Sequence, residues 1–176
     1  MRFLLAIVLV GISLKVNAQS QISFPKSFVG NWSGTLELSP VAKPSQTVNM
    51  ELRIQPSKDT AGHYTWNLIY GAPGTDNRPY ILKPVDTARG HWVIDELNGI
   101  VLDEYFIKDR LVGVFTVQQS TIVSSYTLNP DGQMEVEFIT FLAKPLVTTG
   151  KGDESSPSVD SYEIRSIQKA ILKRSK

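Results

Sequence analysis

The stretch TVNMELRI, residues 47–54, carries the clearest structural signal in this chain of 176 residues. Its even-numbered positions are apolar and its odd-numbered positions are polar. An alternation with a period of two is typical of a β-strand that buries one face and exposes the other to water. The same alternation recurs in residues 32–38 and 63–70, so the sequence predicts a protein built from half-buried strands.

Turn-forming residues separate the alternating stretches at short intervals. Asn98-Gly99 tolerates the positive φ angles of a tight hairpin, and Pro130-Asp131-Gly132 suits a type I turn with a following bulge. The predicted strands are residues 28–38, 47–56, 63–70, 78–86, 91–97, 100–107, 110–117, 120–129 and 133–142.

The short connections between these strands predict how the sheet is arranged. Consecutive strands joined by short connections are antiparallel neighbours. An open sheet of this width would expose two strand edges, and closure into a barrel removes both. We therefore predict an all-β fold, an antiparallel up-and-down β-barrel of about nine or ten strands. A two-sheet sandwich is the alternative, although its crossings usually need longer connections.

Residues 1–18 have the features of a cleaved secretory signal. Arg2 precedes a short apolar run, and the segment ends on the small residues of Val16-Asn17-Ala18. The run is too short to span a bilayer, and no later segment reaches that length. We therefore predict a secreted or periplasmic protein without a transmembrane segment.

The rest of the chain divides by composition. Residues 19–27 form an N-terminal extension, residues 28–144 the barrel, and residues 145–160 a long loop rich in Gly, Ser, Pro and Asp. The basic segment 161–176 fits either a helix with an isoleucine stripe or a final strand that packs on the barrel. We favour the strand, because it could pair with the first strand and close the barrel.

Charge and cysteine content exclude several classes of function. The whole chain has a formal charge of +1, and loss of Arg2 and Lys15 with the signal changes it to −1. This balance argues against nucleic acid as a partner, because nucleic-acid-binding domains usually carry a basic excess. The chain has no cysteine, which excludes disulfides, thiolate metal sites and a cysteine nucleophile.

Several of the later strands are apolar on both faces. Val112 and Val114 lie on one face of their strand and Leu111 and Phe115 on the other, and Ile139 and Phe141 oppose Phe138 and Leu142 in the same way. A strand that is apolar on both sides is covered on both sides. Either the C-terminal segment or a partner chain, such as a second copy in a homo-oligomer, would cover the outer face.

The segment Gly30-Asn31-Trp32 at the head of the strand meander resembles the G-x-W start of the calycins, which include the lipocalins, fatty-acid-binding proteins and avidins. The resemblance implies that Gly30 permits a close bend and that Trp32 plugs the closed end of a barrel. It also implies a basic side chain over the Trp32 indole, supplied by Lys173 or Arg174. At the other end it implies an open cup with a cavity for a small molecule.

Aromatic residues are the candidates for lining such a cavity. Tyr64, Trp66 and Tyr70 share one strand face and combine apolar area with hydroxyl groups. Tyr126 and Phe138 occupy strands that could face them. These rings either surround a ligand or fill the barrel, since small barrels are often packed solid.

Glu104 is an acid in an apolar row, in phase with Leu102 and Phe106. Such an acid points inward to hold a ligand in a cavity. A hairpin centred on 98–99 would place Glu104 opposite Val93. Together with Asp95, Glu96 and Asp103, Glu104 is also compatible with a paired-carboxylate or calcium site, or with a solvated hairpin end.

No cofactor is predicted. The two histidines, His63 and His91, are too far apart in sequence for zinc-ligand spacing, so no metal site is expected. A single histidine could bind a haem iron, as in haem-binding barrels of similar fold, although a histidine at an exposed strand end is the simpler interpretation.

Three functions follow from this sequence. The preferred one is an exported, lipocalin-like binder of a small hydrophobic molecule held in the cavity. The alternatives are an interaction module with a filled barrel, and a cavity-based isomerase or hydrolase that uses Glu104 and a tyrosine. No catalytic motif favours the enzyme, so no catalytic residue is assigned.

Overall fold

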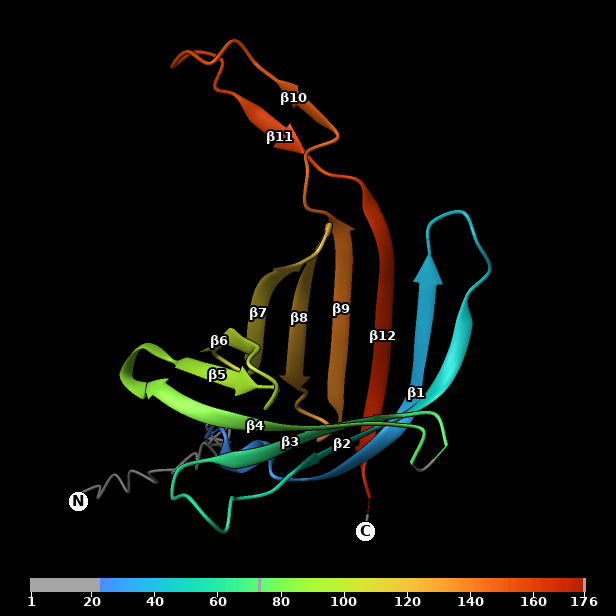
Figure 1. The fold of residues 1–176 in the computed structure, drawn as a ribbon, viewed down its shortest axis with the longest axis vertical. Helices are drawn as coiled ribbons and strands as arrows, with labels where there is room; N and C mark the ends of the chain where they lie inside the picture. The colour runs from blue at the N-terminus through green and yellow to red at the C-terminus, as the bar shows by residue number, and fades with distance from the viewer. Residues whose placement is uncertain (1–22, 73, 176) are drawn as a thin grey trace, which may run out of the picture.

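The computed structural model describes residues 23–72 and 74–175. Ten of its strands form one closed antiparallel barrel in the order β1-β12-β9-β8-β7-β6-β5-β4-β3-β2, which confirms the predicted fold class (Figure 1). Two single-turn 3-10 helices, η1 (Lys26–Phe28) and η2 (Thr87–Arg89), accompany the strands. The barrel strands are β1 (Gly30–Pro40), β2 (Gln46–Ile54), β3 (Tyr64–Tyr70), β4 (Asp76–Asp86), β5 (His91–Asp95), β6 (Val101–Ile107), β7 (Arg110–Val117), β8 (Ser120–Leu128), β9 (Met134–Leu142) and β12 (Ile164–Arg174).

The basic C-terminal segment is a strand and closes the barrel. β12 pairs with β1 on one side, where Trp32 lies opposite Arg174, and with β9 on the other. Its residues alternate between the two faces of the sheet, with Ala170 and Leu172 buried and Ile171 exposed. A helix here would leave the edges of β1 and β9 unpaired, and unpaired edges are costly.

The prediction of a loop over residues 145–160 is only partly correct. β10 (Val147–Thr149) and β11 (Val159–Ser161) form a separate two-stranded hairpin that projects away from the barrel beyond β9 and β12 (Figure 1). Each strand has three residues and all are exposed. Strands this short leave no alternating pattern that a sequence reading can detect.

Aromatic side chains fill one end of the barrel. Phe28 and Trp32 are fully buried there, and the chain before β1 contributes Phe24, whose ring stacks on Phe106 with centroids 4.5 Å apart. The described part of the N-terminal extension therefore packs against the barrel end. The predicted signal, residues 1–18, lies outside the described residues.

Arg174 lies over the Trp32 indole at this closed end, in the way the calycin resemblance implies. Its guanidinium carbon is 4.2 Å from the ring centroid, and the group donates hydrogen bonds to the carbonyl oxygens of Val29 and Ser27. Gly30 makes this approach possible, because a Cβ atom there would lie 2.4 Å from Nη1 of Arg174. Gly30 also has a φ of 152°, which residues other than glycine rarely adopt.

The outer face of β7, β8, β9 and β12 carries an apolar row. Val114 is opposite Val123, Val123 opposite Ile139, and Ile139 opposite Ile167. Of the two alternatives for covering this face, the C-terminal segment does not lie across it, because β12 pairs edge to edge with β9 and extends the sheet. Val114 remains 61% exposed. Within residues 23–72 and 74–175, no helix is long and apolar enough to cross a membrane.

Candidate functional site

The barrel contains a cavity of about 330 Å³ at the end opposite Trp32. The residues that line it lie where β3, β5, β7 and β9 end and where β4, β6, β8 and β12 begin. In an antiparallel barrel these strand ends all lie at the same end. The barrel is therefore hollow at this end, whereas aromatic side chains fill the other. The apolar part of the wall consists of Leu68, Ile94, Leu102, Phe115, Val117, Ile122 and Phe138.

Four of the six predicted ligand-binding residues line this cavity: Tyr70, Glu104, Tyr126 and Phe138. Trp66 does not line the cavity. On β3 it is the next inward-facing residue after Leu68 in the direction of the closed end. It is fully buried there, with its ring edge-on to Tyr126 at a centroid distance of 4.9 Å. Tyr64 begins β3, further still from the cavity, and packs against the core. Trp66 therefore belongs to the filled part of the barrel beneath the cavity.

Glu104 occupies a niche shaped by three neighbouring strands. It is opposite Gly113 on β7, and Gly113 is opposite Ser124 on β8. The Ser124 hydroxyl donates a hydrogen bond of 2.9 Å to Oε1 of Glu104. A Cβ atom at position 113 would lie 2.4 Å from the same oxygen. The missing side chain of Gly113 thus makes room for the carboxyl group.

The carboxyl group of Glu104 is buried but incompletely paired. Only 1% of the residue is exposed, and burial raises its pKa from 4.5 to about 8. The group is therefore mainly uncharged at neutral pH. Its second oxygen, Oε2, has no hydrogen-bond partner among the residues that the structure describes. An unpaired buried polar atom costs about 1–3 kcal/mol, so this atom marks where a partner would be favourable.

The hairpin before Glu104 differs from the predicted register by one residue. Glu104 is opposite Trp92, not Val93. The backbone N–H of Glu96 donates to the carbonyl oxygen of Ile100, which makes a three-residue loop in which Leu97 and Gly99 have positive φ. The Asn98-Gly99 signal located the turn, but not which residues close it.

The corrected register separates the four acids of this hairpin. Asp95 pairs with Lys83, and Asp103 lies 2.7 Å from Nε2 of His91. Glu96 and Glu104 line the cavity, but only Glu104 lies in the niche of Gly113 and Ser124. These four acids therefore do not form the paired-carboxylate site that the sequence left open as a possibility.

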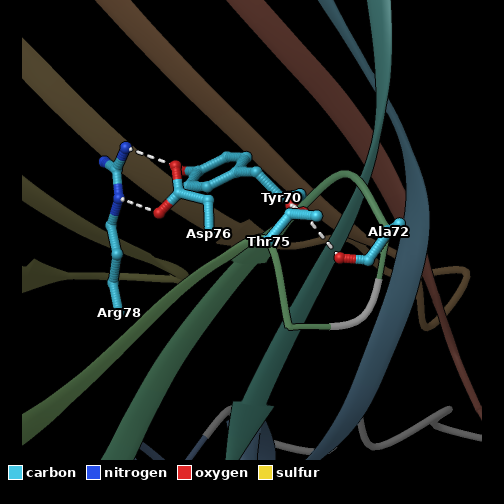
Figure 2. A network of polar contacts seen from close by, with 5 residues as sticks. All are labelled: Tyr70, Ala72, Thr75, Asp76 and Arg78. Atoms are coloured by element: carbon cyan, nitrogen blue, oxygen red, sulfur yellow. Dashed lines mark hydrogen bonds and ion pairs between the residues drawn. The ribbon is translucent and has the colours of Figure 1, made fainter.

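Tyr70 at the end of β3 and Arg78 near the start of β4 line one part of the cavity, and a network of polar contacts surrounds them (Figure 2). Arg78 donates two hydrogen bonds to Asp76, of 3.0 and 2.9 Å, and its guanidinium carbon lies 4.8 Å from the Tyr70 ring centroid. The Thr75 hydroxyl donates to the carbonyl oxygens of Ala72 and Tyr70. The hydrogen bonds from Arg78 lower the pKa of Asp76, which keeps this pair charged.

The tyrosine hydroxyls of the cavity stay protonated over the physiological pH range. Burial raises the pKa of Tyr70 to about 12 and that of Tyr126 well above its usual value of 10. Together with Ser124 and Thr140 they give the cavity uncharged hydroxyl groups. Charged side chains enter the wall through Arg78 and Glu96, both next to the loops at the open end.

Neither histidine lines the cavity. His91 lies on the outer face, with its ring stacked on Tyr105 at 4.7 Å, and His63 lies in the connection from β2 to β3. A haem held in the cavity would have no histidine ligand. In the part of the chain that the structure describes, no group of three His, Cys, Asp or Glu residues is placed to hold a metal ion.

Some lining residues were not among the sequence candidates. Arg78, Tyr80, Phe115 and Gln168 all contribute to the wall. Phe115 is in phase with buried Leu111, and Gln168 is in phase with buried Ala170, so alternation could have found them. Arg78 and Tyr80 belong to β4, whose mixed polar pattern gives no such signal.

Replacing Gly113 with alanine should destabilise the protein by about 1–3 kcal/mol, because the new methyl group would displace the Glu104 carboxyl. Chemical denaturation would measure the loss. In a Glu104→Ala background the same replacement should cost much less, because the crowding atoms are gone. An equal loss of stability in the two backgrounds would contradict the interpretation that Gly113 makes room for the Glu104 carboxyl group.

Comparison with known proteins supports the fold. No protein-family model and no curated protein matches the sequence. Among solved structures, the chain is similar to a DUF3598-family protein of unknown function from Nostoc punctiforme, with a TM-score of 0.60, 11% identity and 85% of this chain covered. The match spans 48% of that protein, about half its length.

A second similar structure is the S-type phycobiliprotein lyase CPES from Guillardia theta. The TM-score is 0.51 at 12% identity, and the match covers 86% of this chain and 91% of the lyase. At this identity the likeness is one of fold. The closed ten-strand barrel and these two structures agree on a calycin-like fold for the chain.

Proposed function

We propose that this protein is an exported, calycin-like binding protein that holds a small, mostly apolar molecule in its barrel cavity. The observation that carries the proposal is the cavity itself, about 330 Å³, within the range of about 300–1,000 Å³ that is usual for small-molecule sites. Export rests on the signal predicted over residues 1–18.

The wall of the cavity has the composition that small-molecule sites use. Leu68, Leu102, Phe115, Ile122 and Phe138 supply apolar surface, which favours an apolar ligand by about 25 cal/mol for each Å² removed from water. A small number of polar groups interrupt this surface, and such groups orient a ligand and provide specificity.

The two alternatives have less support. A filled barrel does not account for the hollow end. An enzyme would need a second titratable group within hydrogen-bond reach of Glu104, whereas the hydrogen-bond partner of Glu104 among the described residues is Ser124. The apolar row on the outer face, which the interaction module would use, is independent of the cavity and compatible with ligand binding.

A bulky side chain inside the cavity should abolish binding of an apolar probe. We expect N-phenylnaphthylamine, a neutral dye that fluoresces in apolar sites, to bind the native protein. Thr140 lines the cavity, and Thr140→Trp should weaken binding about tenfold or more, because the indole would occupy the ligand volume.

The matched control is Thr121→Trp, the same replacement on the outer face of the neighbouring strand, where Thr121 lies opposite Thr116 and Phe141. Its dye affinity should equal that of the native protein. Absence of dye binding, or equal loss in the two variants, would contradict a cavity site. Native mass spectrometry of protein purified without denaturant would then identify a retained ligand by its mass.

A further inference from the structure

We propose that Glu104 is the polar anchor of the cavity, and that it selects an uncharged, mostly apolar molecule with a carbonyl-type hydrogen-bond acceptor at its buried end. This inference rests on the proposed binding function and adds the chemical class of the ligand. It depends on the placement of Glu104, on its unpaired oxygen and on the surroundings of the carboxyl group.

Gly113 leaves room for a carboxyl group at this point of the cavity wall. The inner sides of β6, β7 and β8 present Glu104, Gly113 and Ser124 in one row across adjacent strands. Gly113 is not a positive-φ residue, so the backbone does not require glycine there. The space it leaves is filled by the Glu104 carboxyl. The space at Gly113 and the hydrogen bond from Ser124 together fix the position of the Glu104 carboxyl group.

One oxygen of the buried carboxyl group has no hydrogen-bond partner among the described residues. Oε1 accepts the hydrogen bond from Ser124, whereas Oε2 is unpaired among the described residues. A protonated carboxyl group has one O–H donor and keeps acceptor capacity on the other oxygen. We place the proton of the uncharged acid on Oε2, because Oε1 already accepts a hydrogen bond, and infer that Oε2 donates it to a ligand carbonyl oxygen.

The surroundings favour an uncharged ligand over a cationic one. Leu102, Phe115 and Ile122 contribute apolar surface to the wall, and Tyr126 contributes a protonated hydroxyl. An ammonium group bound here would have to be stripped of water and would also require Glu104 to ionise, and both changes are costly in a buried site. A carbonyl group needs only the hydrogen bond that the neutral acid offers.

Three probes with nearly the same carbon skeleton test this choice: methyl naphthyl ketone, ethylnaphthalene and naphthylethylamine. We expect calorimetry at a pH of about 6, where the acid is protonated, to show the ketone binding about tenfold more tightly than the hydrocarbon. The amine, which is a cation at this pH, should bind more weakly than either.

Two variants assign the preference to Glu104. Glu104→Leu should bind the ketone and the hydrocarbon equally, whereas Glu104→Gln, which keeps an N–H donor, should retain most of the preference for the ketone. Glu37→Leu is the matched control, because Glu37 is an exposed residue of β1. It should behave as the native protein does.

The outcomes separate the two proposals. If none of the three probes binds, the binding function itself fails and the anchor fails with it. If the hydrocarbon binds as well as the ketone, or the amine binds best, the cavity binds ligands but the anchor inference is wrong. The comparison of probes on the native protein decides this even if Glu104→Leu does not fold.

Discussion

Replacing Trp32 with alanine should lower the free energy of unfolding by about 3–5 kcal/mol. Trp32 is 1% exposed at the closed end of the barrel, so the replacement leaves a large cavity. It also removes the hydrogen bond of 2.9 Å from the indole N–H to the carbonyl oxygen of Phe28 and the ring beneath the Arg174 guanidinium. Urea denaturation followed by circular dichroism would measure the change.

Two further variants make this prediction specific. Trp32→Phe keeps part of the packing but loses the donor to Phe28, so it should cost less than the alanine variant and more than about 1 kcal/mol. Ser33→Ala, at the exposed neighbouring position of β1, should stay within about 0.5 kcal/mol of the native protein. If Trp32→Ala cost no more than Ser33→Ala, Trp32 would not be the plug of this barrel.

The stability of the protein should fall as the pH rises from 4.5 towards 8, and Glu104 should be the main cause. Burial raises the pKa of Glu104 from 4.5 to about 8, so the folded protein keeps this proton over a range in which the unfolded chain releases it. Unfolding then releases a proton, and higher pH favours the unfolded state. The shift corresponds to roughly 3–5 kcal/mol, present in full below pH 4.5 and lost by about pH 8.

Glu104→Gln removes this dependence, because an amide does not titrate in this range. Denaturation curves between about pH 5 and pH 9 should show the variant gaining stability relative to the native protein up to about pH 8 and little beyond it. Glu37→Gln, an exposed position of β1, should instead run parallel to the native protein. Parallel curves for Glu104→Gln would show that Glu104 ionises as easily in the folded state as in the unfolded chain.

The architecture could be predicted because its signals are local. The alternation in residues 47–54 predicted β2 as a half-buried strand, and Met50, Leu52 and Ile54 are buried as it required. Short connections predicted antiparallel neighbours, and the cost of open edges predicted closure. The same reasoning favoured a strand for the C-terminal segment, which the pairing of β12 with β1 confirms.

The candidate site was predictable only in part. The phase of Glu104 with Leu102 and Phe106 marked it as an inward acid, and Glu104 does line the cavity. The same argument chose Trp66, which lies beneath the cavity in the filled core. Alternation gives the face of a side chain but not its height in the barrel, and the height decides which rings meet a ligand.

The sequence by itself determined that this protein is an antiparallel barrel with Trp32 and Glu104 facing inward, because a period of two and the turn residues act over a few neighbouring positions. The tertiary structure decided where the barrel is hollow, because the packing of Phe24 and Phe28 into one end depends on residues far apart in the chain. It also decided the environment of Glu104. Gly113 and Ser124 come to lie beside that acid only through the register of β6, β7 and β8, and another register would place other residues opposite it.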